Sequence, residues 1–298
     1  MTSTPAERSR ALIELIFAGV LWGFGFIGTV WCLQFLSPAA ILSYRFGMAF
    51  LASLIILIFR KVPLAILKNE LRLAFVPALI LWLCLMTQTF GLKYTTATNS
   101  TFITTLYVVI VPLLHSLSGQ EKLHWLHWFC VFLALLGTGF IVQVQDLSEL
   151  NWGDLLTLIC ALFAALHILL IGQRALNTQN DFALNAFQAF WICLFSLLFF
   201  PFSEKWDLSV LNDKGWIGLL VLGFGSSLIA FYLQVRSQKI LSPSVVSLLF
   251  LLESPAACLF AYWLLNEQLS SWQWLGAGLI LVACGLISLK TEAVEHSV

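Results

Sequence analysis

The chain has 298 residues, of which 60% are hydrophobic and only 10% are charged, and its formal net charge is zero. Soluble domains usually carry about 25% charged residues, so this composition excludes a water-covered globule and indicates a protein that lies in the lipid bilayer. A neutral chain also gives no electrostatic reason to expect a nucleic-acid partner.

Long apolar windows follow one another from the first to the last part of the chain. A helix needs about 20 apolar residues to cross the hydrocarbon core of a membrane. The ten predicted spans are residues 11–33, 39–59, 72–92, 97–118, 124–144, 152–174, 182–202, 215–236, 243–265 and 271–289. No small-residue cleavage site follows the first span, so we expect it to be retained. The connections are too short for a soluble domain.

Lysine and arginine are unevenly divided between the two ends of these spans. The ends that share a side with both termini hold eleven: Arg8, Arg10, Arg60, Lys61, Lys68, Arg72, Lys122, Arg174, Arg236, Lys239 and Lys290. The opposite ends hold Lys93, Lys205 and Lys214. Because cytoplasmic loops are enriched in lysine and arginine, we expect both termini in the cytoplasm and the chain in the cell inner membrane.

The two halves of the chain resemble each other. A shift of 146 residues aligns 77–143 with 223–289 without a gap. The identical pairs that are least expected by chance are Gln88/Gln234, Lys93/Lys239, Glu121/Glu267 and Trp128/Trp274. A shift of 143 pairs the earlier stretch less closely, with Arg45 on Gln188 and His167 near Phe24.

Each half contains five predicted spans, an odd number, so the second half should enter the membrane upside down. We therefore expect two inverted five-helix repeats, residues 11–145 and 152–290, with short tails at 1–10 and 291–298. Inverted repeats that share a site at the bilayer midplane are the basis of alternating access in many secondary transporters. The pattern thus predicts a transporter.

Four segments carry a resemblance to a known family: VLWGFGF (20–26), YRF (44–46), and residues 91–114 and 251–286. In these segments the chain resembles the drug/metabolite transporter superfamily, specifically its EamA-type members. The resemblance covers nearly the whole chain and implies an all-α integral membrane fold of ten transmembrane helices. It implies secondary transport of small metabolites, with amino-acid export common and uptake of vitamin- or nucleoside-like compounds also known. In DLLTLICALFAALH (154–167) we find no counterpart to Trp22–Gly23.

Glu253 lies in the middle of a predicted span, two residues before Pro255. A charged side chain at the bilayer centre costs about 3 kcal/mol on insertion scales, so we expect Glu253 to face protein or a water-filled cavity. Its counterpart in the first half is Tyr107. Because burial favours the neutral carboxyl group, Glu253 is a candidate for proton coupling and substrate binding. The alternative is a permanently protonated group that only hydrogen-bonds a neighbouring helix.

Other polar and aromatic groups inside the spans are candidates for substrate binding. For Arg45 the alternatives are an ion pair, an extended side chain that reaches the interface, or contact with an anionic substrate group. For His167 a helix–helix hydrogen bond competes with substrate contact. The same alternatives apply to Gln88, Thr104, Gln188 and Gln234, while Trp22, Phe24 and Phe26 are candidates for an amphipathic pocket wall. Glu121 and Glu267, at span ends, are interpreted as structural.

The remaining patterns argue against an enzyme or a cofactor. His124 and His127 have no carboxylate or thiolate at ligand spacing, and the seven cysteines fall singly in apolar runs, so no metal site is predicted. Neither HExxH nor a phosphate-binding GxxxxGK[ST] motif occurs.

Gly19 and Gly23 form a GxxxG spacing, which predicts close helix packing. A passive channel or flippase remains the alternative, and proton coupling and a monomeric or homodimeric state stay open.

Overall fold

The computed structural model describes residues 4–95, 100, 103–117, 124–142, 151–199, 205–265 and 268–293. Throughout these residues the chain is helical or forms connections, and it contains no strand. Glu121, Lys122 and Glu267, which were considered in the sequence, lie outside this part.

The helices follow the predicted windows. They are α1 (Pro5–Leu33), α2 (Pro38–Phe59), α3 (Leu64–Gly91), α5 (Tyr107–Leu117), α6 (Trp125–Val142), α7 (Trp152–Ala175), α8 (Asp181–Phe199), α9 (Asp213–Leu220), the π-helical η2 (Val221–Ala230), α10 (Phe231–Ser237), α11 (Pro243–Phe250), α12 (Glu253–Leu265) and α13 (Ser271–Ala293). A short 3₁₀ turn, η1 (Leu208–Val210), precedes α9. Within the described ranges, eight stretches are long and apolar enough to cross a membrane. Two shorter apolar helices, Tyr107–Leu117 and Trp125–Phe140, occupy the fourth and fifth predicted windows.

Several helices begin where a capping side chain precedes a proline. Ser37 caps α2 through the Ala40 N–H, and Pro38 is the first helical residue. The pairs Thr4–Pro5 and Ser242–Pro243 start α1 and α11 in the same way. Proline fits the first turn because its missing N–H has no helical partner there, so these pairs fix where each span begins.

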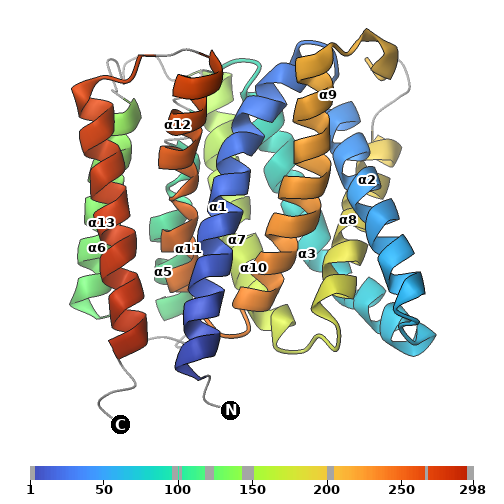
Figure 1. Cartoon of the computed structure of the whole chain (residues 1–298), viewed down its shortest axis with the longest axis horizontal. Coiled ribbons are helices and arrows are strands. Elements are labelled where there is room, and N and C mark those ends of the chain that lie inside the picture. Colours follow the sequence, from blue (N-terminus) through green and yellow to red (C-terminus); the bar gives the residue numbers. More distant parts are fainter. Residues whose placement is uncertain are drawn as a thin grey trace.

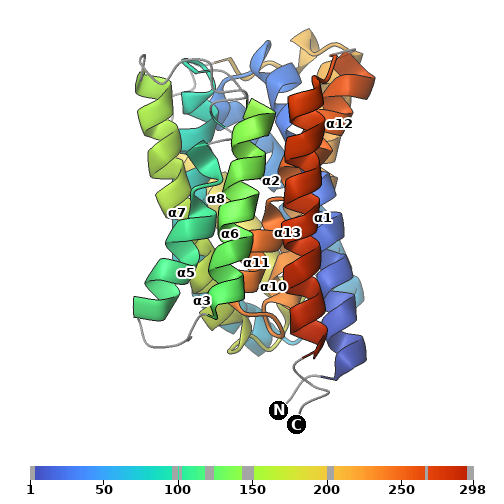
Figure 2. The same cartoon turned by 90° about the vertical axis from the view of Figure 1, so that its left-hand side faces the viewer.

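The helices stand side by side in one upright bundle (Figure 1). The start of α1 and the end of α13 lie at the same end of the bundle, which is hereafter the inner end (Figures 1 and 2). α6 packs on α13, α3 on α7, and α2 on α8, so each of these interfaces joins the two halves of the sequence. α1 contacts α12, η2, α10 and α11, which places it against the second half along its length.

The predicted span 243–265 is not one continuous helix. α11 ends at Phe250, Leu251 and Leu252 form a turn, and α12 begins at Glu253. Pro255 explains part of the break, because it has no N–H to continue the ladder of α-helical hydrogen bonds. The predicted span 97–118 is interrupted in the same way at residues 105–106, directly before α5.

The 146-residue shift found in the sequence recurs in the backbone hydrogen bonds. At the two breaks, Leu106 N–Ile103 O matches Leu252 N–Leu249 O, Val108 N–Thr105 O matches Ser254 N–Leu251 O, and Ile110 N–Leu106 O matches Ala256 N–Leu252 O. Four backbone bonds also recur where α3 and α10 end. After α3 they are Leu92 N–Gln88 O, Lys93 N–Phe90 O, Tyr94 N–Gly91 O and Thr95 N–Gly91 O. After α10 the matching bonds are Gln238 N–Gln234 O, Lys239 N–Arg236 O, Ile240 N–Ser237 O and Leu241 N–Ser237 O.

The register between α1 and α7 differs from the 143-residue shift predicted for this stretch. Leu36 N donates to Cys32 O at the end of α1, and Thr178 N donates to Arg174 O at the end of α7. The residue numbers of these two matching bonds differ by 142. His167 therefore corresponds to Gly25 rather than to Phe24. In this register Trp22 and Gly23 correspond in position to Ala164 and Ala165, so the Trp–Gly pair itself is not repeated.

Glu70 anchors the connection between α7 and α8 to α3. Its fully buried carboxylate accepts from Thr178 Oγ1 at 2.6 Å and from Gln179 N at 2.9 Å.

Glu70→Ala should lower the free energy of unfolding by about 1–3 kcal/mol, because both donors lose a buried acceptor. Thermal melting in detergent checks this, with exposed Lys68→Ala as the matched control. Equal melting temperatures for the two variants would contradict the anchoring role.

Candidate functional site

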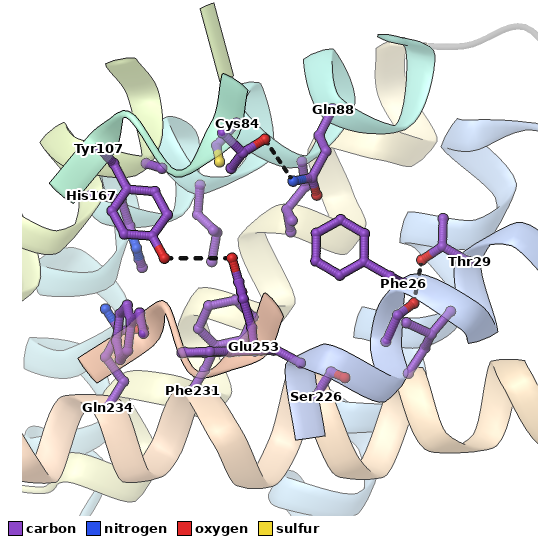
Figure 3. A pocket seen from close by; sticks show the side chains of 18 of the residues that line it. Phe26, Thr29, Cys84, Gln88, Tyr107, His167, Ser226, Phe231, Gln234 and Glu253 are labelled. Carbon is purple, nitrogen blue, oxygen red and sulfur yellow. Dashed lines mark hydrogen bonds between the residues drawn. The ribbon is translucent and has the colours of Figure 1, made fainter. Parts of the chain in front are cut away.

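A pocket lies in the middle of the bundle, where the break before Glu253 faces α3, α7 and the start of α5 (Figure 3). It holds about 800 Å³ of empty space, its open mouth included. Polar side chains and aromatic rings line it together, as is typical of sites that bind small molecules. Both interrupted spans contribute to it, through Thr104 and Tyr107 in one and Phe250 and Glu253 in the other.

Most of the residues singled out in the sequence meet here. The candidates that line the pocket are Trp22, Arg45, Gln88, Thr104, Tyr107, His167, Gln234 and Glu253. Gln188 lies behind the wall, where its Oε1 is 3.2 Å from His167 Nε2. Phe24 does not line the pocket, because it packs edge-on against Phe260 and Trp31. The expectation that Phe24 forms part of the pocket wall is therefore wrong.

Glu253 points across the pocket toward Tyr107 (Figure 3). The Tyr107 hydroxyl donates to Glu253 Oε1 over a long 3.4 Å. Glu253 is 9% exposed, and in the part of the chain that the structure describes no second side chain bonds its carboxyl group. The carboxyl group thus faces the cavity with bonding capacity left for a proton or a substrate donor.

Arg45 brings a positive charge to the same cavity. Its Nε donates to Ser227 Oγ at 2.8 Å, and its guanidinium carbon lies 5.0 Å from the centre of the Phe46 ring. Arg45 is 6% exposed, so it does not extend to the interface. Among the described residues no carboxylate forms an ion pair with it. Guanidinium groups donate through five N–H bonds, so Arg45 keeps donors available toward the pocket.

Paired polar side chains form two opposite parts of the wall. Gln88 Nε2 lies 3.5 Å from Thr104 Oγ1, and Gln234 Nε2 donates to Gln238 Oε1 at 2.9 Å. The Gln88–Thr104 bond joins α3 to the segment before α5, whereas the Gln234–Gln238 bond stays within the end of α10, and each satisfies part of its amide. Because both glutamines also line the cavity, their remaining groups can contact a ligand.

Aromatic rings supply the apolar part of the wall. Trp22 packs edge-on against Phe250 at 4.7 Å and against Phe231 at 5.1 Å between ring centroids. The Trp22 Nε1 atom is buried and has no hydrogen-bond partner among the described residues. Rings beside a few convergent polar groups are typical of sites that bind amphipathic small molecules.

The sequence reasoning missed several lining residues that the repeat could have found. The repeat-related pairs that line the pocket are Trp22/Ala164, Gly25/His167, Phe26/Ile168, Leu85/Phe231, Gln88/Gln234, Thr104/Phe250 and Tyr107/Glu253. Phe231 and Phe250 are thus the 146-residue counterparts of Leu85 and of the predicted Thr104. Ser226 and Cys84 also line the cavity. Their counterparts, Ile80 and Ala230, do not, and no sequence signal marks them.

Comparison with known proteins gives matches over nearly the whole chain. An uncharacterized transporter from Archaeoglobus fulgidus is 32% identical over 285 residues, which are 95% of this chain and 87% of the relative. A solved structure titled only as a crystal structure of a protein has a similar fold, with a TM-score of 0.81 at 17% identity over 96% of this chain and 99% of that one. The EamA-like transporter family model matches twice, at residues 9–143 and 151–289. The chain therefore belongs to the EamA-like transporter family, within the drug/metabolite transporter superfamily, and is a multi-pass membrane transporter.

Proposed function

We propose that this transporter is a secondary active exporter of small metabolites, amino acids or related compounds, and that it works by alternating access at the central pocket. The observation that carries the proposal is the pocket itself. It places in one cavity a carboxyl group with free bonding capacity, an aromatic wall and an arginine that has no ionic partner among the described residues. A zwitterionic or amphipathic solute would find a partner for each of its groups there.

The arrangement of the halves supports alternating access by inverted repeats. The family model matches each half separately, and matching backbone bonds recur at both interrupted helices. Discontinuous helices around a midplane site are typical of transporters built from inverted repeats. The lysine and arginine distribution favours an inner end in the cytoplasm, and export from there is the proposed direction.

The proposal is tested by identifying a ligand and following its flux. Purified protein is screened by thermal melting against amino acids, nucleosides and vitamins, because a ligand that binds the folded state raises the melting temperature with its concentration. The ligand found is then added outside everted vesicles, whose cytoplasmic face points outward, under an imposed proton gradient. Saturable accumulation of an amino acid supports the proposal, and accumulation of a vitamin or nucleoside in right-side-out vesicles favours the importer alternative. Flux that never saturates indicates a channel.

Arg45→Ala should weaken transport of anionic or zwitterionic solutes more than that of neutral analogues. The reason is that the guanidinium group faces the pocket without a carboxylate partner among the described residues. The loss in apparent affinity should be about tenfold or more, since a charge-assisted hydrogen bond contributes about 1.5–3 kcal/mol. Competition uptake with matched charged and neutral analogues measures it, with Arg45→Lys retaining part of the preference. Equal losses for both analogues would count against substrate contact.

A further inference from the structure

The pocket has a tightly packed floor toward the inner end, where α7 meets α10. Ile168 and Gln234 line the floor, and Gln238 lies behind them. Gln238 Nε2 donates to the main-chain oxygen of Ile168 at 2.8 Å, and both residues are 3% exposed. Gly172, one turn further along α7, allows the start of α11 to approach, since a Cβ there would lie 3.0 Å from Pro243 Cγ.

The counterparts of this contact lie in the open part of the pocket. The 146-residue and 142-residue shifts place Leu92 at the position of Gln238 and Phe26 at that of Ile168. Leu92 follows α3 as Gln238 follows α10, with the same bond from its N–H to a glutamine oxygen four residues earlier. Yet Phe26 and Leu92 are half-buried and both line the cavity. Over Pro5–Leu33 and Leu64–Gly91, α1 and α3 contact each other less than α7 and α10 do.

Other repeat-related contacts are present in both copies. α3 packs on α7, and its counterpart, α10 against α1, is also packed. During alternating access the two repeats exchange conformations. A contact that both repeats make can persist through this exchange. A contact that only one repeat makes must break in that repeat and form in the other.

We propose that Ile168 and Gln238 form the inner gate of the pocket, and that Phe26 and Leu92 form an outer gate that closes when the inner gate opens. The inference rests on the proposed alternating-access function. The two gates differ in chemistry, because the inner gate has a side-chain hydrogen bond and the outer gate has leucine in place of the donor. That bond stabilises the closed inner gate, so the pocket rests open toward the outer end.

Native Cys84 reports the side on which the pocket is open, because its side chain lines the cavity. A membrane-impermeant maleimide is added to right-side-out or everted vesicles, and labelling of the peptide that contains Cys84 is followed by mass spectrometry. Cys84→Ser identifies the signal. The unmodified protein should be labelled faster from the outer side. Equal labelling from both sides would overturn the preferred outer-open resting state, and with it the proposed gates.

Exchanging the two gate residues separates the gate inference from the transport function. Gln238→Leu removes the inner donor and should raise inner-side labelling about fivefold, the effect of one hydrogen bond on an equilibrium. Leu92→Gln offers a donor to the Phe26 oxygen, and the double exchange should reverse the preferred side. Gln173→Leu, the same change at an exposed position on α7, should leave labelling unchanged. One-sided labelling that neither Gln238→Leu nor the double exchange alters would overturn the gates and leave the transport function standing.

Discussion

Replacing Glu253 with glutamine should abolish proton-driven transport and leave the folded protein and solute exchange intact. Glutamine keeps the size of the side chain and an oxygen that accepts from the Tyr107 hydroxyl, but it cannot take up or release a proton. A carboxyl group at mid-depth, 9% exposed and bonded by one long hydrogen bond among the described residues, is suited to carry a proton across the cycle. The measurement is uptake into vesicles with and without an imposed pH gradient.

Two outcomes would separate the roles left open for Glu253. If the variant keeps the pH dependence of the unmodified transporter, Glu253 does not couple protons. If the variant fails to accumulate as folded protein, the carboxyl group has a structural role. Tyr107→Phe is the matched control, because it removes the same hydrogen bond and leaves the carboxyl group, so proton drive should remain.

Replacing Gly23 with alanine should strongly destabilise the transporter, even though only one methyl group is added. A Cβ at Gly23 would lie 2.7 Å from Ala256 Cβ, 2.8 Å from Glu253 O and 2.9 Å from Ala257 N. These atoms belong mostly to the backbone of α12, so the helix that carries Glu253 would have to move. Overpacking of this kind costs about 1–3 kcal/mol or more. The melting temperature in detergent and the yield of monodisperse protein should both fall.

A series of glycine substitutions gives the control for Gly23. Gly19→Ala should have an intermediate effect, since its nearest contact would be Leu252 Cβ at 3.3 Å. Gly139→Ala and Gly278→Ala should be tolerated, because no atom of the described chain lies within 4 Å of the added group. Equal losses at Gly23 and Gly278 would show that the close approach of α1 to α12 is unimportant.

The membrane fold was predictable because apolar windows of span length occur where the helices form. The GxxxG spacing of Gly19 and Gly23 likewise predicted a close helix contact, which the structure places between α1 and α12. The breaks at residues 105–106 and 251–252 were harder to predict, because leucine-rich segments favour a continuous helix. Pro255 weakens the ladder but does not fix where the helix stops.

The candidate site was partly predictable for a physical reason. Polar groups such as Glu253, Arg45 and Gln234 are costly in lipid, so their presence inside spans indicated a protein-lined cavity. Phe24 was misplaced because an aromatic residue gives no such signal, and it packs equally well against Phe260 and Trp31. Phe231 and Phe250 were missed for the same reason, although the predicted Thr104 pointed to Phe250 through the repeat.

Counterflow in proteoliposomes most directly tests whether one pocket is reached alternately from the two sides of the membrane. Vesicles are loaded with the unlabelled ligand found by melting, and a trace of labelled ligand is added outside. Transient accumulation of label above equilibrium, seen only when unlabelled ligand is trapped inside the vesicles, is the predicted result. Label that enters linearly and never exceeds equilibrium, with or without trapped ligand, would contradict the account.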